Sequence, residues 1–121
     1  MDVRSAHMAR RKMSHVIDEL YTALFRAGGK KVELRLLKEE KGLRLIGRGD
    51  FAPEHKKDLE RMAELLTPAV RSPALVEAYW ELAGGDQYTS DSEMSLVGQM
   101  LDEVKVEFTG EEIALDLFLY F

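Results

Sequence analysis

The spacing of apolar residues changes at the glycine pair Gly28-Gly29. Over residues 12–27 apolar side chains recur every three or four positions, which predicts a helix with one apolar face. Glycine readily takes the left-handed conformation that ends a helix, so the pair predicts where this helix stops. After the pair, apolar and charged residues alternate over residues 32–36, which is the period of a strand with one buried face. The chain must therefore combine helices with a sheet.

Two hairpins are predicted, one in each half of the chain. Residues 43–45 alternate in the same way as the first strand, and a polar turn separates the two. Residues 104–108 alternate again and lead into a turn at Thr109-Gly110. The last segment, residues 113–121, is apolar on both faces apart from Asp116, as expected for a central strand that helices cover on one side.

Three further helices are predicted between the hairpins. One begins near Pro53, because proline is favoured in the first helical turn. The next follows Ser72-Pro73 and ends at Gly84-Gly85, and the last begins at Ser90, where Glu93 completes a capping box. This order of elements predicts an α+β fold, a two-layer sandwich with helices on one face of a mixed sheet.

The composition fits one domain that needs no disulfides. The chain has 121 residues, of which 45% are hydrophobic and 32% charged, and no cysteine, which favours a cytoplasmic setting and excludes thiolate metal sites. No apolar stretch approaches the ~20 residues of a membrane helix, and residues 1–12 lack the apolar core of a signal peptide. We expect residues 1–11 to be an N-terminal extension or an expression remnant and residues 12–121 to form a single domain, cytoplasmic and without membrane insertion.

Charge is divided unevenly along the chain. Residues 1–48 carry 12 Lys and Arg against 6 Asp and Glu, a balance of +6, whereas residues 49–121 carry 5 against 16, a balance of −11. The basic half could present a face to an anionic ligand, or both halves could simply supply solvated surfaces. Nucleic acid is not an expected partner, because no helix is rich in Arg or Lys and the acidic half would repel a phosphate backbone.

Both ends of the domain resemble one family. Residues 16–24 (VIDELYTAL), followed by the strand at residues 32–36, resemble the first box of the ATP-binding domain of sensor histidine kinases and anti-sigma-factor kinases. Residues 96–108 resemble the last helix and closing hairpin of these GHKL, or Bergerat-fold, ATPases, and the resemblance covers about residues 12–121. It implies a histidine-kinase ATPase-like fold that binds Mg-ATP between helices and sheet. An active member would be an ATP-dependent histidine or serine kinase.

The resemblance assigns a role to Glu19 and exposes a defect beside it. The first box of the family has an acidic residue, matched here by Glu19, which would act as the catalytic general base. Four positions later the family has an asparagine that ligates magnesium, but this chain has Ala23, which has no oxygen to offer a metal. His7, His15 and His55 do not form a pair with metal-ligand spacing, so no metal ligand is predicted.

The cofactor-binding positions implied by the resemblance are also altered. The second motif falls on Gly47, Gly49 and Asp50, where two glycines and one aspartate are present in a different order from the family's adenine-binding motif. The third motif, which cradles phosphate at a helix start, falls on a segment that begins at Thr89. That segment has no glycine and two carboxylates, which repel phosphate.

These departures predict a degenerate histidine-kinase-like ATPase domain with a regulatory or protein-binding role in signal transduction. Its partner would be a regulatory protein or an adjoining sensor domain. Two alternatives stay open: an active ATP-binding catalytic domain of a histidine or anti-sigma-factor kinase, with Mg-ATP as cofactor, and a homodimeric interaction module.

Overall fold

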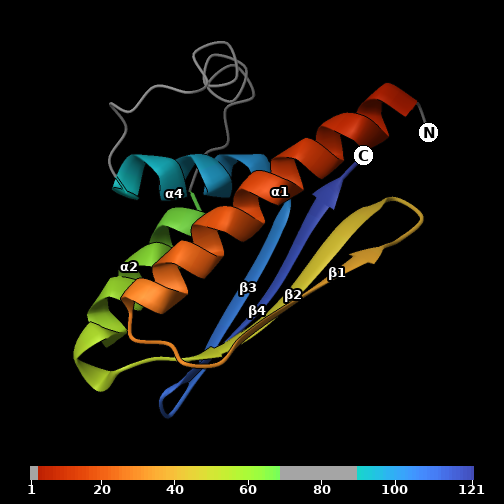
Figure 1. The fold of residues 1–121 in the computed structure, drawn as a ribbon. Helices are drawn as coiled ribbons and strands as arrows, with labels where there is room; N and C mark the ends of the chain where they lie inside the picture. The colour runs from red at the N-terminus through yellow and green to blue at the C-terminus, as the bar shows by residue number, and fades with distance from the viewer. Residues whose placement is uncertain (1–2, 69–89) are drawn as a thin grey trace.

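The computed structural model describes residues 3–68 and 90–121 and folds them into helices packed on a four-stranded sheet (Figure 1). In chain order the elements are α1 (Val3–Arg26), β1 (Val32–Lys38), β2 (Gly42–Asp50), the 3-10 turn η1 (Pro53–His55), α2 (Lys56–Leu66), α4 (Ser90–Met100), β3 (Glu103–Thr109) and β4 (Glu112–Tyr120). Both predicted hairpins are present. The helix predicted after Ser72-Pro73 and its end at Gly84-Gly85 lie outside the described residues.

The sheet has the order β1-β2-β4-β3, and every neighbouring pair of strands is antiparallel. The α+β class predicted from the sequence is confirmed, but the mixed sheet is wrong. An alternating pattern marks which residues form a strand, whereas the direction in which β2 and β4 meet depends on the path of the chain between them. The register places Gly47 opposite Leu115 and Asp50 opposite Glu112. β4 is a central strand, as its apolar character predicted.

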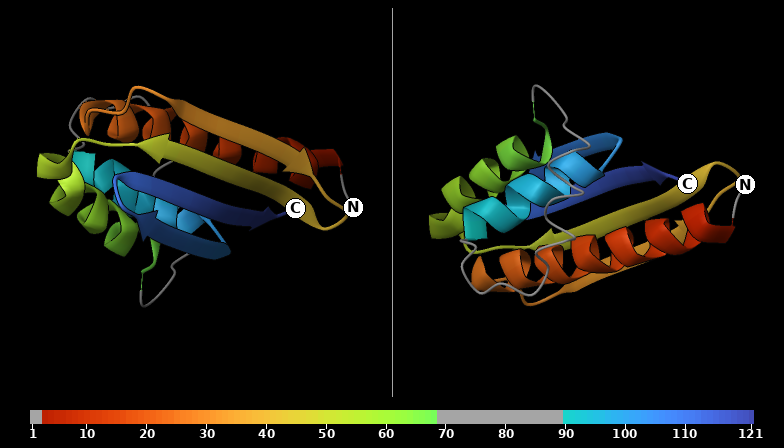
Figure 2. Two further views of the ribbon diagram at one scale, coloured as in Figure 1. Left: turned by 90° about the horizontal axis from the view of Figure 1, so that it is seen from below. Right: turned by 90° about the horizontal axis from the view of Figure 1, so that it is seen from above.

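All described helices lie on one face of the sheet, as the views from below and above show (Figure 2). The sheet side chains on that face are buried, and they include Leu43, Leu45, Ile113, Leu115, Leu117 and Leu119. They pack against one stripe of α1, made by Met13, Val16, Leu20, Leu24 and Ala27. Each such buried side chain contributes roughly 1.5–3 kcal/mol to folding. This apolar layer packs α1 against the sheet.

Helix α1 is longer at its start than the sequence pattern indicates. It begins at Val3, and Ala9 is only 2% exposed within the core, so residues 3–11 continue the helix that the pattern places over residues 12–27. Its end is as predicted: Gly28 has φ of 86°, the amide of Gly28 donates to Phe25 O at 3.0 Å, and the amide of Gly29 donates to Leu24 O at 3.0 Å. These two bonds close the helix in a Schellman motif.

The other two helices pack closely against each other. α2 follows the 3-10 turn that begins at Pro53, and it buries Leu59, Met62 and Leu66. α4 begins at Ser90 and crosses α2 at Gly98, where an added Cβ would collide with the backbone of Leu65 and Leu66. Only glycine permits this approach. It brings the start of α4 near α1, where residues from the two ends of the chain meet.

On the face away from the helices, the two oppositely charged halves of the chain contact each other. Arg44 Nη1 of β2 donates to Asp116 Oδ1 of β4 at 2.7 Å, and Arg44 Nε donates to Glu39 Oε2 at 2.9 Å. The guanidinium also lies 4.8 Å from the ring centroid of Phe118. Arg44 is thus paired with carboxylates of its own chain at the protein surface. At this position the basic charge belongs to a surface ion pair, which favours the solvated-surface interpretation over a face for an anionic ligand.

Candidate functional site

A hollow of about 300 Å³ opens between α1 and α2, on the helical side of the molecule. Its floor is apolar and includes Ala23, Ala27, Leu59, Met62, Leu65 and Met94. Its rim is polar and includes Glu19, Arg26, His55, Asp58 and Arg61. Small-molecule sites usually have an apolar lining and a few polar groups, and this volume lies at the low end of their range. The hollow is therefore the first candidate for ligand binding.

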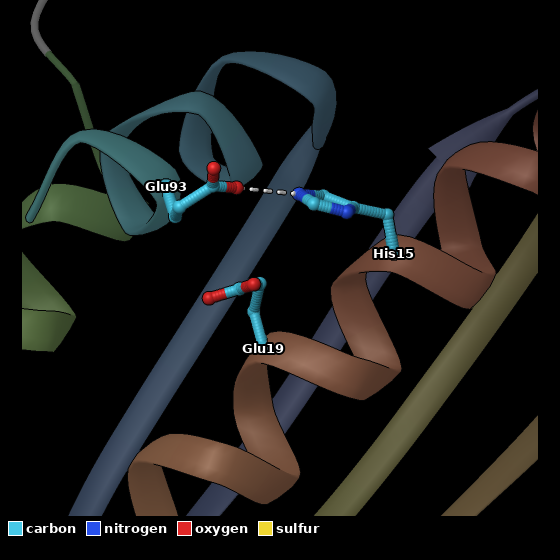
Figure 3. A group of neighbouring side chains, drawn as sticks. All are labelled: His15, Glu19 and Glu93. Carbon is cyan, nitrogen blue, oxygen red and sulfur yellow. Dashed lines mark ion pairs between the residues drawn. The ribbon is translucent and has the colours of Figure 1, made fainter. Parts of the chain in front are cut away.

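Three polar side chains gather at the edge of this hollow, between α1 and α4 (Figure 3). His15 and Glu19 are four residues apart on α1, so they lie on the same face one turn apart. Glu93 reaches toward them from α4, and its Oε2 lies 3.2 Å from His15 Nε2. One imidazole nitrogen of His15 and one carboxylate oxygen from each glutamate all lie within 4.8 Å of one another. We call these three residues the His15 cluster.

The His15 cluster is partly withdrawn from water. The side chains of His15 and Glu93 are 18% and 19% exposed. Burial and the neighbouring charge of Glu93 raise the pKa of the Glu19 carboxyl above its ordinary value, while the nearby His15 acts in the opposite direction. The charged form of Glu19 is therefore less favourable here than in water. A cation bound beside the carboxylate would stabilise that charged form.

Ala23 lies one turn beyond Glu19 and lines the floor of the hollow. The resemblance places a magnesium ligand at this position, but the side chain presents only a methyl group there. Next to it, Thr22 also lines the hollow, and its Oγ1 donates to Asp18 O at 2.9 Å. Position 23 itself thus lacks the oxygen that the resembled family uses to hold Mg²⁺.

Asp50 lies elsewhere, at the end of β2, and its carboxylate is engaged within the fold. Asp50 Oδ1 accepts hydrogen bonds from the amides of Lys30 and Lys31, both at 2.8 Å. These amide bonds hold the pKa of Asp50 below its ordinary value. The side chain therefore ties the end of β2 to the chain that leads into β1.

The two glycines before Asp50 are set into the sheet. A Cβ on Gly47 would lie 2.7 Å from Leu34 Cδ2, so the absence of a side chain serves core packing at that point. Gly49 and Asp50 line a second shallow hollow together with Lys31, Glu33, Arg48 and Glu112, and Glu19 does not line it. Thr89 lies outside the described residues. Within residues 3–68 and 90–121, the structure does not bring the predicted nucleotide positions into one pocket.

The sequence pattern did not indicate that His15 and Glu93 lie side by side. His15 is expected to be a partly exposed helical residue, and Glu93 is expected to cap its own helix or repel phosphate, so neither is predicted to ligate a metal. The spacing of His15 and Glu19 on one helix face was a readable signal. Glu93 is more than 70 residues away in the sequence, and only the packing of α4 against α1 places it there.

None of the helices in the part of the chain that the structure describes is both long enough and apolar enough to cross a membrane. The chain was also compared with known proteins. No protein-family model, no curated protein and no solved structure matches it.

Proposed function

We propose that this chain is a degenerate member of the GHKL, or Bergerat-fold, ATPases that regulates signalling by binding another protein and does not turn over ATP. The order of its described elements supports the proposal: a first helix, a hairpin, further helices and a closing hairpin, with the helices on one face of the sheet. The partner would be a regulatory protein or an adjoining sensor domain.

The observation that carries the degenerate form of this proposal is the state of Asp50. A carboxylate that recognises adenine must offer its oxygens to the base, whereas Asp50 Oδ1 already accepts the amides of Lys30 and Lys31 at 2.8 Å. These two bonds fix the carboxylate at the end of β2, on a hollow that Glu19 does not line, so Asp50 and Glu19 do not share a site for one nucleotide. ATP would also lack a magnesium ligand at Ala23.

Calorimetric titration of the full chain with Mg-ATP and with Mg-ADP tests the proposal. We expect no saturable heat, because the adenine, magnesium and phosphate contacts implied by the resemblance are altered together. The matched variant is Ala23→Asn, which restores the magnesium ligand alone and should still bind no nucleotide. Micromolar binding by the wild-type chain that disappears in Glu19→Ala would overturn the proposal.

An active ATP-binding catalytic domain is the second candidate, and the hollow between α1 and α2 is the observation that favours it. Its volume of about 300 Å³ and its apolar floor could accept part of a nucleotide base, with Glu19 on the rim. The same titration separates the candidates, because an active domain must bind Mg-ATP saturably before it can transfer a phosphoryl group.

A further inference from the structure

We infer that His15, Glu19 and Glu93 form a binding site for one divalent transition-metal ion, with Zn²⁺ as the representative case. This function goes beyond the proposed one and does not depend on it, because the three ligands require no nucleotide. The resembled family places its magnesium ligand at the position of Ala23. The proposed site uses three other residues.

The geometry of the three side chains carries the inference. Zinc binds imidazole nitrogen and carboxylate oxygen at about 2.0–2.2 Å, so donor atoms around a tetrahedral ion lie roughly 3.4 Å apart. His15 Nε2 and Glu93 Oε2 are already 3.2 Å apart, and all three donor positions fall within 4.8 Å of one another. The Glu19 oxygen is the donor that must come closer, and its side chain has rotatable bonds that allow it to move toward the other two.

The donor set indicates which metals fit. An imidazole together with carboxylates suits zinc and its first-row neighbours, whereas Mg²⁺ and Ca²⁺ prefer all-oxygen sites. Two negative carboxylates would balance the charge of a dication, and neutral His15 would complete a three-residue ligand set. This leaves a fourth position for water or for a small ligand, as in zinc sites with three protein ligands.

The surroundings of the His15 cluster favour binding in two further ways. Two carboxylates from separate helices face each other where His15 and Glu93 are less than one-fifth exposed, so their mutual repulsion is only partly screened by water. A dication between them replaces repulsion with attraction. Glu19 also lines the hollow of about 300 Å³, so at least this member of the His15 cluster can be reached from solvent.

The position of the ligands predicts a mechanical effect. His15 and Glu19 belong to α1, while Glu93 belongs to the first turns of α4. An ion held by all three would add metal–ligand bonds between two helices that already meet through the His15–Glu93 contact and through side-chain packing. Because the ion binds the folded chain and not the dispersed ligands of the unfolded chain, it should raise the melting temperature as its concentration rises.

Titration of the full metal-free chain with ZnCl₂ by isothermal calorimetry tests the inference, with thermal unfolding followed in parallel. We expect saturation at one Zn²⁺ per chain and a melting temperature that increases with zinc. Co²⁺ should give the visible absorption of a low-coordinate site, and Mg²⁺ in large excess should not displace it.

Single substitutions identify the ligands. Glu93→Gln preserves size and should weaken zinc binding by at least about 10–100-fold, the loss typical even of residues that only support a ligand. His15→Ala should do the same. The matched control is His7→Ala, which removes an exposed histidine eight residues before His15 on α1, outside the His15 cluster and the hollow, and should leave zinc affinity unchanged.

Circular dichroism of each metal-free variant verifies that it folds, and if His15→Ala does not fold, Glu93→Gln decides alone. The inference is overturned if the wild-type chain binds no zinc at one equivalent. It is equally overturned if Glu93→Gln binds zinc as tightly as wild type, or if His7→Ala abolishes binding. None of these results depends on the outcome of the Mg-ATP titration.

Discussion

The carboxylates of Asp50 and Glu19 stand at two sites implied by the same family resemblance, and their surroundings differ. Asp50 is open to solvent, and its oxygen accepts two backbone amides from its own chain, which lowers its pKa. Glu19 is partly buried beside a second carboxylate and at the edge of a hollow, which raises its pKa. The end of β2 is therefore satisfied by the fold itself, whereas the edge of α1 is arranged so that a cation would stabilise it.

The contrast between Asp50 and Glu19 indicates that a ligand is more readily accommodated beside α1 than at the end of β2. Substitutions at the end of β2 should change stability, because the contacts there are internal. Substitutions of the polar α1 residues that line the hollow should change ligand binding. Substitutions of the buried α1 residues that face the sheet should change stability. Neighbouring positions on one helix or strand can therefore be used to separate the two kinds of effect.

Leu20→Ala should produce the largest loss of stability. Leu20 directly follows Glu19 but is fully buried, so its truncation leaves a cavity beneath α1 and should lower the free energy of unfolding by about 2–5 kcal/mol. Urea unfolding measures the loss. Phe25→Ala on the same helix is the control, because Phe25 is 54% exposed and stacks on Tyr21 at the surface, so its removal should cost about 1 kcal/mol or less. Equal losses in the two variants would contradict the assignment of faces on α1.

Gly47→Ala should be the next most damaging change. An added Cβ would lie 2.7 Å from Leu34 Cδ2 and 3.3 Å from Leu115 Cδ1. Because both atoms are the ends of leucine side chains that can shift, the cost should be at the low end of overpacking, about 1 kcal/mol. Gly49→Ala, two residues along the same strand, meets its nearest atoms at 3.6 Å and should remain within about 0.5 kcal/mol of wild type. Thermal unfolding of both variants gives the comparison. A fully stable Gly47→Ala chain would show that this glycine is not held by core packing.

Asp50→Asn should have the smallest effect, and that effect should depend on pH. Because the folded state lowers the pKa of Asp50, its carboxylate adds stability above the ordinary pKa of 3.8, and this contribution disappears as pH falls through the lowered value. The difference in unfolding free energy between wild type and Asp50→Asn should thus be full at neutral pH and shrink below pH 3.8. Asp50→Ala should lose more than Asp50→Asn, which keeps one acceptor oxygen. A difference that grows on acidification would contradict this account.

Much of the fold could be predicted from local patterns. The stripe on α1, its end at Gly28, the two hairpins and the turn at Gly110 follow from residue spacing and from backbone preferences of glycine. The start of α1 could not be predicted, because residues 3–11 carry basic side chains and a weak apolar pattern, and their place in the helix depends on Ala9 packing into the core. The antiparallel order of β2 and β4 was likewise beyond a local pattern.

The candidate site was less accessible to sequence reasoning than the fold. Glu19 was predicted to be a site residue, because its box resembles a known one. The structure places it on the hollow between α1 and α2, and its role as a general base stays a prediction. Asp50 was expected to face a ligand, but its hydrogen bonds to Lys30 and Lys31 depend on a chain reversal that brings residues about twenty positions apart together. Glu93 was expected to serve its own helix, and its proximity to His15 follows from the packing of α4.

By itself, the sequence determined which segments become helices and strands and which faces of them are apolar, because these properties depend on neighbours within a few residues. Only the tertiary structure decided which polar groups meet. His15 and Glu19 share a helix face by spacing alone, but the third member of the His15 cluster arrives through the close crossing of α4 over α2 at Gly98. Contacts between distant segments depend on how the whole core packs, and no local pattern encodes that arrangement.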